Sequence, residues 1–230
     1  MATYDLCVKP GWAPPSTDRA AAFSRFVGMT AGRLRDRLAT HRCRVELVPA
    51  DIVYITGPTA TGKSLLLREF QRLLPPSETV DASALEVPDA PTVVDCFEGQ
   101  ILETVRLLTV VLLSGAFAAL SRPSRLSTGQ KQQFRLARAL AARARFLVAD
   151  DFCSHLDPIS AMTVAGNVHK LAKRTTTTLL LAGTRQDILM ELAPDVLILK
   201  EGQGETKVVY RTARAPHAPG HGGPRARSAS

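Results

Sequence analysis

The sequence feature that most constrains the fold is the run GPTATGKS at positions 57–64. It follows a β-rich run, 52–56, and precedes a segment with apolar residues at helical spacing. The run fits Gly-x4-Gly-Lys-Ser/Thr, in which glycines let backbone amides surround phosphate oxygens at the start of a helix. A chance glycine-containing turn is the alternative, and the strand–loop–helix context argues against it. The pattern therefore predicts a P-loop, the Walker A motif of nucleotide-binding α/β domains.

Each residue type in this loop has a role toward a nucleoside triphosphate. Lys63 is expected to reach the terminal phosphates, and the Ser64 hydroxyl is expected to ligate Mg²⁺. ATP and Mg²⁺ are therefore the predicted cofactors. The predicted nucleotide-binding residues are Gly57, Pro58, Thr59, Ala60, Thr61, Gly62, Lys63, Ser64 and Leu65.

A second motif is an apolar run, 146–149, that ends in Asp150 and Asp151. At the carboxyl end of a strand in an open α/β sheet, side chains face the ligand crevice. Asp150 is then placed to hold magnesium, and Asp151 to orient or deprotonate a water molecule. Two aspartates after a strand can also cap a helix. The P-loop upstream favours a Walker B motif.

Between the two ends of the chain, strand and helix patterns alternate, which predicts an α/β domain with a largely parallel sheet flanked by helices. Strands are expected over 52–56, 146–149, 177–181 and 196–199, with an edge strand over 207–210. Helices are expected over 64–74, 100–113, 129–144, 158–172 and 186–192.

The length of 230 residues allows one globular domain. Pro and Gly residues at 10–17 suggest a flexible N-terminal segment over 1–20, and the region after Thr212 lacks apolar periodicity. We therefore expect an ATPase domain over 21–211 and a disordered tail over 212–230.

Four cysteines without a CxxC pair, and no apolar signal core, predict a reducing, cytoplasmic setting. The longest apolar run, 107–120, is too short to cross a bilayer, so no membrane insertion is expected. The net charge of +8 leaves two interpretations open, a solvated basic surface and a nucleic-acid partner. Scattered arginines without interleaved aromatic residues favour the first.

A third segment, Leu126-Ser127-Thr128-Gly129-Gln130, opens a predicted helix about 20 residues before the aspartate pair. Ser127 is suited to cap that helix, and the exposed amides at its start form an anion site. The segment resembles the LSGGQ signature of ABC (ATP-binding cassette) ATPases, and 154–157 resembles their D-loop. The order of these motifs matches that family over roughly 45–199.

This resemblance implies a P-loop NTPase that hydrolyses ATP as a head-to-tail homodimer. Ser127, Gly129 and Gln130 of one copy would contact the ATP held on the P-loop of the other. Asp151 stands where the family has its catalytic glutamate, and Thr184 stands at or near the switch histidine. Asp89 stands in place of the Q-loop glutamine and is a further candidate Mg²⁺ ligand. These departures predict slow hydrolysis.

The segment between the P-loop helix and the signature is short, so a reduced helical subdomain is expected. The chain in this respect resembles stand-alone, non-transporter cassettes, some of which are fused to acetyltransferase-like domains. The alternatives are the ATPase subunit of a transporter and an ATP-gated regulatory or nucleic-acid-associated switch with little hydrolysis. Phe23 and Phe26 are candidates for stacking on adenine.

Overall fold

The computed structural model describes residues 1–230 except 12–16, 31–32, 34–39, 203, 205 and 212–230. The predicted tail over 212–230 therefore lies outside the described residues, as does part of the predicted flexible segment over 1–20.

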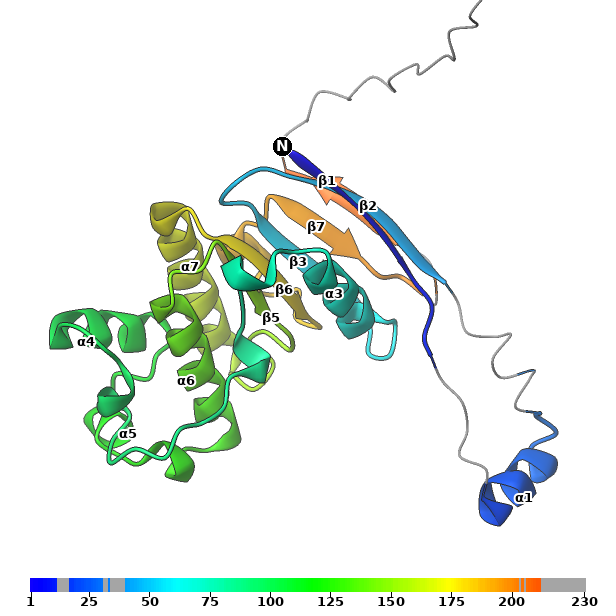
Figure 1. Ribbon diagram of the computed structural model, residues 1–230, viewed down its shortest axis with the longest axis horizontal. Coiled ribbons are helices and arrows are strands. Elements are labelled where there is room, and N and C mark those ends of the chain that lie inside the picture. Colours follow the sequence, from blue (N-terminus) through cyan, green and yellow to red (C-terminus); the bar gives the residue numbers. More distant parts are fainter. Residues whose placement is uncertain (12–16, 31–32, 34–39, 203, 205, 212–230) are drawn as a thin grey trace, which may run out of the picture.

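A six-stranded sheet in the order β4-β5-β6-β3-β7-β8 forms the centre of the fold (Figure 1). Neighbouring strands run parallel, except that the edge strand β8 is antiparallel to β7. The predicted, largely parallel sheet is confirmed. Its strands are β3 (Ile52–Thr56), β4 (Thr79–Asp81), β5 (Phe146–Ala149), β6 (Thr178–Gly183), β7 (Val196–Leu199) and β8 (Lys207–Tyr210).

Successive residues of β3 pack into different cores because side chains alternate across a strand. Ile52 and Tyr54 join a core built with α6 (Thr128–Ala141) and α7 (Pro158–Thr175). Val53 and Ile55 join a second core built with α3 (Lys63–Arg72). All five residues of β3 are buried, as expected for a parallel strand covered on both faces.

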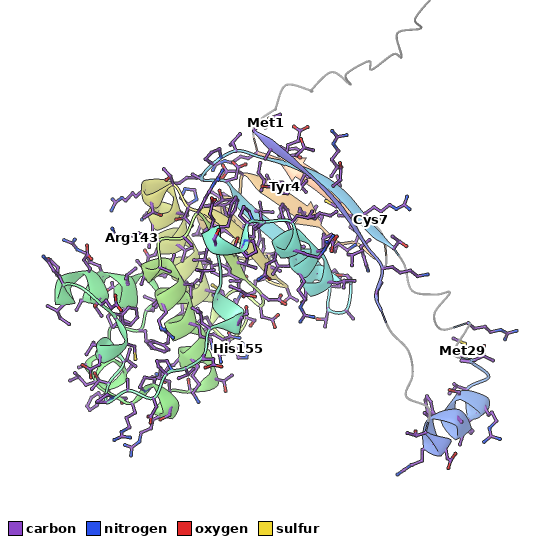
Figure 2. All side chains as sticks on the ribbon, in the orientation of Figure 1. Met1, Tyr4, Cys7, Met29, Arg143 and His155 are labelled. Carbon is purple, nitrogen blue, oxygen red and sulfur yellow. The ribbon has the colours of Figure 1, made fainter. Side chains whose placement is uncertain are left out.

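A separate two-stranded antiparallel sheet, formed by β1 (Ala2–Val8) and β2 (His41–Leu47), lies over the α3 side of the main sheet (Figure 1). Leu6 of β1 is only 2% exposed. The ring of Tyr4, labelled in Figure 2, lies 5.2 Å from that of Phe70 on α3, measured between centroids.

The expectation of a flexible segment over 1–20 is therefore wrong for Ala2–Val8. All seven of these residues pair with β2. The Pro- and Gly-rich composition that suggested flexibility begins only after β1, and one short strand that buries few side chains gives a weak sequence pattern.

The segment between α3 and α6 contains only short elements. Besides strand β4, they are η1 (Pro76–Glu78), η2 (Ala82–Ala84), η3 (Val94–Cys96), α4 (Ile101–Val110), α5 (Ala116–Ala119) and η4 (Pro123–Arg125). The helix expected over 100–113 ends at Val110, because Leu112 has a left-handed φ of 58°. Near the other end of the domain, α8 (Leu189–Leu192) is shorter than the helix expected over 186–192.

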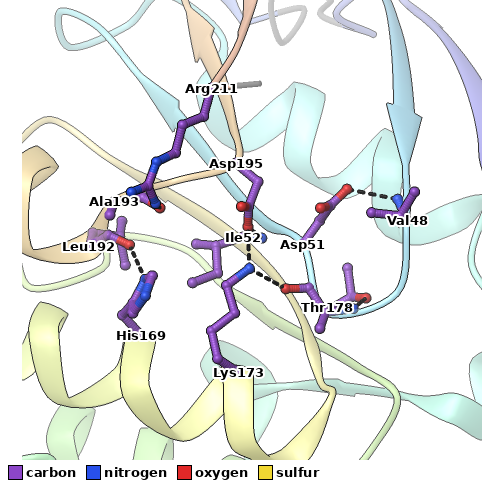
Figure 3. Close-up of polar contacts among 11 residues, drawn as sticks. Val48, Asp51, Ile52, His169, Lys173, Thr178, Leu192, Ala193, Asp195 and Arg211 are labelled. Atoms are coloured by element: carbon purple, nitrogen blue, oxygen red, sulfur yellow. Dashed lines mark hydrogen bonds and ion pairs between the residues drawn. The ribbon is translucent and has the colours of Figure 1, made fainter. Parts of the chain in front are cut away.

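Asp195 joins three segments at the amino ends of the central strands (Figure 3). Its Oδ2 accepts hydrogen bonds from the Ile52 amide at 2.8 Å and from Lys173 Nζ at 2.6 Å. Lys173 also donates to the carbonyl of Ala50 at 2.9 Å. Ile52 is fully buried, so this carboxylate satisfies an amide that water does not reach.

The Asp195 network gives a prediction about stability. Asp195→Ala should lower the free energy of unfolding by about 1–3 kcal/mol, because it leaves a buried amide without its acceptor. Lys173→Met should cost less than about 1 kcal/mol, because that ion pair is partly exposed. Urea denaturation of both variants checks the ranking, and a larger loss for Lys173→Met would contradict it.

Candidate nucleotide site

The loop between β3 and α3 requires glycine at both ends. Gly57 has φ 145° and Gly62 has φ 88°. A Cβ on Gly57 would lie 2.1 Å from the carbonyl oxygen of Lys200, and one on Gly62 would lie 2.6 Å from Cε1 of His41. The loop is thus fixed by close contacts with the residue after β7 and with the first residue of β2.

Lys63, the first residue of α3, is 8% exposed and lies against the loop. Its Nζ donates to the carbonyls of Gly57 at 3.0 Å and Pro58 at 2.7 Å. Burial lowers the pKa of this ammonium, and the nearby carboxylates of Asp151 and Asp150 oppose that shift. Lys63 is therefore close to both carboxylates of the second motif.

A pocket lies against the loop, and residues from several distant segments line it. The lining includes Asp151 and Thr184 as well as several predicted P-loop residues, among them Lys63 and Ser64, so the structure brings these predicted site residues together. The complete lining is Pro10, His41, Thr59, Ala60, Gly62, Lys63, Ser64, Leu65, Asp151, Ser154, His155 and Thr184.

The aspartate pair follows β5, at the same edge of the sheet as the P-loop. The amide of Asp151 donates to Asp150 Oδ1 at 3.0 Å, and Asp151 has a left-handed φ of 52°. The next amide, of Phe152, donates to the carbonyl of Ala182 on β6 at 2.8 Å, which holds the turn against the sheet. Positive φ in a non-glycine residue is uncommon and recurs at functional sites.

The oxygen donors at this edge fit a magnesium ion. Mg²⁺ is usually held by one or two carboxylates together with substrate phosphates. Ser64 supplies a hydroxyl from the start of α3, and Asp150 supplies a carboxylate that acts electrostatically on Lys63. Within the described ranges, no group of three or more His, Cys, Asp or Glu could hold a metal ion. Ser64 and Asp150 would hold Mg²⁺ together with the phosphates of ATP.

The signature segment caps α6 as the sequence predicts. Ser127 Oγ accepts from the Gln130 amide at 3.2 Å, and Gln130 Oε1 accepts from the Ser127 amide at 3.0 Å. Gly129 packs against His155, whose Cβ would lie 3.4 Å from a Cβ on Gly129; His155 is labelled in Figure 2. Among the described residues that line the P-loop pocket, none belongs to α6.

The structure does not bring Asp89 to the site. Asp89 lies in the loop between η2 and η3 and lines neither the P-loop pocket nor the second pocket, beside Asp150. Ala82 and Ser83 line that second pocket instead, and Ser83 Oγ accepts from the Asp150 amide at 3.0 Å. Sequence reasoning missed Ser83 because the strand before it, β4, has only three residues.

Phe23 and Phe26 also lie outside the pocket. Both belong to α1 (Asp18–Phe26), where they are 66% and 89% exposed, and neither lines the P-loop pocket. The candidate adenine contact therefore falls on neither residue in this structure.

The sequence is similar to ATP-binding subunits of importers. It is 38% identical over 97 residues to the methionine import ATP-binding protein MetN of Myxococcus xanthus, which covers 42% of this chain and 29% of that protein. It is 30% identical over 177 residues to the aliphatic sulfonates import ATP-binding protein SsuB 3 of Rhodococcus jostii, covering 69% of this chain and 64% of that protein. The chain thus spans less than two thirds of the length of these two relatives. No protein-family model matches it.

The match covers a larger share of two other proteins, a plant relative and a solved structure. The ABC transporter I family member 17 of Arabidopsis thaliana is 26% identical over 204 residues, covering 76% of each chain. A dimeric ATP-binding cassette in a post-hydrolysis state, bound to ADP and Pi, has a TM-score of 0.59 at 16% identity. That match covers 78% of this chain and 94% of the other, and it shows a shared fold.

The fold is therefore that of an ATP-binding cassette, and the sequence is similar to import ATP-binding proteins and to a member of an ABC transporter family. None of the helices in the described part of the chain combines the length and apolar character needed to span a bilayer.

The Lys63 contacts give a binding prediction. Lys63→Ala should weaken Mg-ATP binding at least tenfold, about 1.4 kcal/mol, because the main cation facing the phosphates is lost. Titration calorimetry measures the dissociation constant. Arg72→Ala is the matched control, since Arg72 at the other end of α3 is exposed and pairs with Glu69. An unchanged constant for Lys63→Ala would end the P-loop assignment.

Proposed function

We propose that this chain binds Mg-ATP on residues 57–64 and hydrolyses it slowly in a head-to-tail homodimer. The observation that carries the proposal is the separation of two phosphate-binding features within one chain. The P-loop pocket contains Lys63 and Ser64, whereas the start of α6 contributes nothing to that pocket.

The start of α6 has the properties of an anion site. The first amides of a helix have no partner within the helix, and they carry positive potential. Ser127 Oγ and Gln130 Oε1 satisfy the Gln130 and Ser127 amides, and α6 runs for 14 residues. A triphosphate on the P-loop of a second copy supplies the missing anion.

The lining of the P-loop pocket also supports the dimer. Ser154 and His155 of the D-loop line it, and His155 packs against Gly129, so the P-loop pocket and the signature are linked through one short segment. The similar cassette solved with ADP and Pi is itself dimeric.

Slow hydrolysis is expected from the two side chains that we propose to act on water. Asp151 carries its carboxylate one methylene shorter than glutamate, and Thr184 lacks an imidazole. A positioning error of about 1 Å can lower a rate about a hundredfold. Lys63, Ser64 and Asp150 remain in place as the electrostatic part of catalysis.

The cassette could work in either of two settings, as a stand-alone ATPase or as the subunit of a transporter. We propose a stand-alone, cytoplasmic ATPase, because the segment between α3 and α6 contains only short helices and all four cysteines are free. The second candidate is a transporter subunit, favoured by the names of the relatives and by exposed apolar side chains of α4 and α5. Those side chains are Ile101, Leu102, Val105 and Phe117. Co-expression with neighbouring genes distinguishes the two, since only a transporter subunit recovers a membrane-embedded partner.

The homodimer can be tested by light scattering. The Asp151→Asn variant should bind ATP without consuming it, and should shift from monomer to dimer when Mg-ATP is added. Ser127→Arg in the same background should stay monomeric, because it blocks the start of α6 while leaving the P-loop intact. A monomer in both variants at saturating ATP contradicts the head-to-tail arrangement.

The hydrolytic role of Asp151 can be tested by single-turnover kinetics. Asp151→Asn should lower the rate about a hundredfold, within the usual range for loss of a general base, and Asp151→Glu should raise it. Assays with and without DNA or RNA test the nucleic-acid-associated alternative. If Asp151→Asn hydrolyses ATP as fast as the unmodified chain, an ATP-gated switch replaces the slow enzyme.

A further inference from the structure

A buried polar cluster lies behind the P-loop. Lys200, directly after β7, is fully buried, and its Nζ donates to His41 Nδ1 at 2.8 Å and to Thr206 Oγ1 at 2.8 Å. His41 is 4% exposed and lines the P-loop pocket. Neither residue was singled out from the sequence.

The Lys200 contact fixes which imidazole nitrogen carries the proton. An ammonium only donates hydrogen bonds, so His41 Nδ1 must accept. The neutral ring then carries its proton on Nε2. The Cε1–Nε2 edge faces Gly62, at 2.6 and 2.7 Å from the position that a Cβ would occupy there. His41 therefore presents a donor beside the residue that precedes α3.

The charge on Lys200 has no anionic partner among the described residues. Its side-chain partners are an imidazole and a hydroxyl. The thiol of Cys43 is nearby, and burial raises its pKa to about 11, so it is neutral. Burial also lowers the pKa of Lys200 itself. A buried charge without a counter-ion is unfavourable, and phosphates on the P-loop are the anions that would approach it.

Lys200 also contacts the opposite end of the loop through its backbone. Its amide donates to the Thr56 carbonyl at 2.8 Å, and its carbonyl fills the space beside Gly57. One residue therefore supports the loop at Gly57 directly and at Gly62 through His41.

We propose that His41 is a phosphate-facing residue of the nucleotide site, donating from Nε2, and that Lys200 is the positioning residue that holds it in this tautomer. This rests on the proposed function, because it requires a nucleotide on residues 57–64. It adds a second side-chain hydrogen-bond donor to the site beyond Lys63.

Titration calorimetry with Mg-ATP on the full chain tests the proposed roles of His41 and Lys200. His41→Leu fills the same space without a donor and should weaken binding about tenfold, the loss of about one charge-assisted hydrogen bond. His41→Gln keeps one acceptor and one donor and should bind within about threefold of the unmodified chain. Lys200→Met should weaken binding about as much as His41→Leu. Because Lys200 is fully buried, this change also carries a risk to folding. Cys43→Ala, a buried change on the same strand, should leave the dissociation constant unchanged.

The outcomes separate this proposal from the proposed function. If the unmodified chain does not bind Mg-ATP, the proposed function fails. A second outcome is that the unmodified chain binds Mg-ATP, Lys63→Ala does not, and His41→Leu binds normally. In that case only the proposal for His41 and Lys200 is wrong. Equal losses for His41→Gln, His41→Leu and Cys43→Ala would assign His41 to packing alone and overturn the proposal. The His41 variants decide the question even if Lys200→Met fails to fold.

Discussion

The tight packing of a glycine loop against a buried lysine is the contact on which the site depends. Lys200 follows the strand beside β3, and its carbonyl leaves no space for a side chain at Gly57. The parallel sheet makes this contact possible, because parallel strands end at one edge and bring loops from distant parts of the chain together. The P-loop, the aspartate pair and Thr184 follow β3, β5 and β6, so they meet at that edge.

Much of the fold could be predicted because its strands and helices are long or strongly apolar. β3, β5 and β7 match the expected bounds, since each is a short apolar run between polar or turn-forming residues. The N-terminal strand β1 was missed because only one of its seven residues, Leu6, is buried. A strand with so few buried side chains leaves little apolar pattern in the sequence.

The site could be predicted where chemistry and spacing occur in one short segment. The P-loop and the Ser127–Gln130 cap are such segments, and both have the expected local geometry. Ser83 could not be found in this way, because its role depends on β4 lying beside β5. Asp89 was chosen because it resembles the Q-loop position of the ABC family. In this structure Ser83, which follows β4 more closely, contacts Asp150 instead.

The distribution of charge explains why nucleotide and dimer should depend on each other. Each chain has buried or partly buried cations on one side of the phosphate pocket, and a helix start that points to no anion of its own pocket. In the proposed head-to-tail dimer, a triphosphate held on one P-loop would face the positive start of α6 in the other copy. One anion would then interact favourably with both copies, which would couple ATP binding to dimer formation. Hydrolysis would remove part of that negative charge and so weaken the contact.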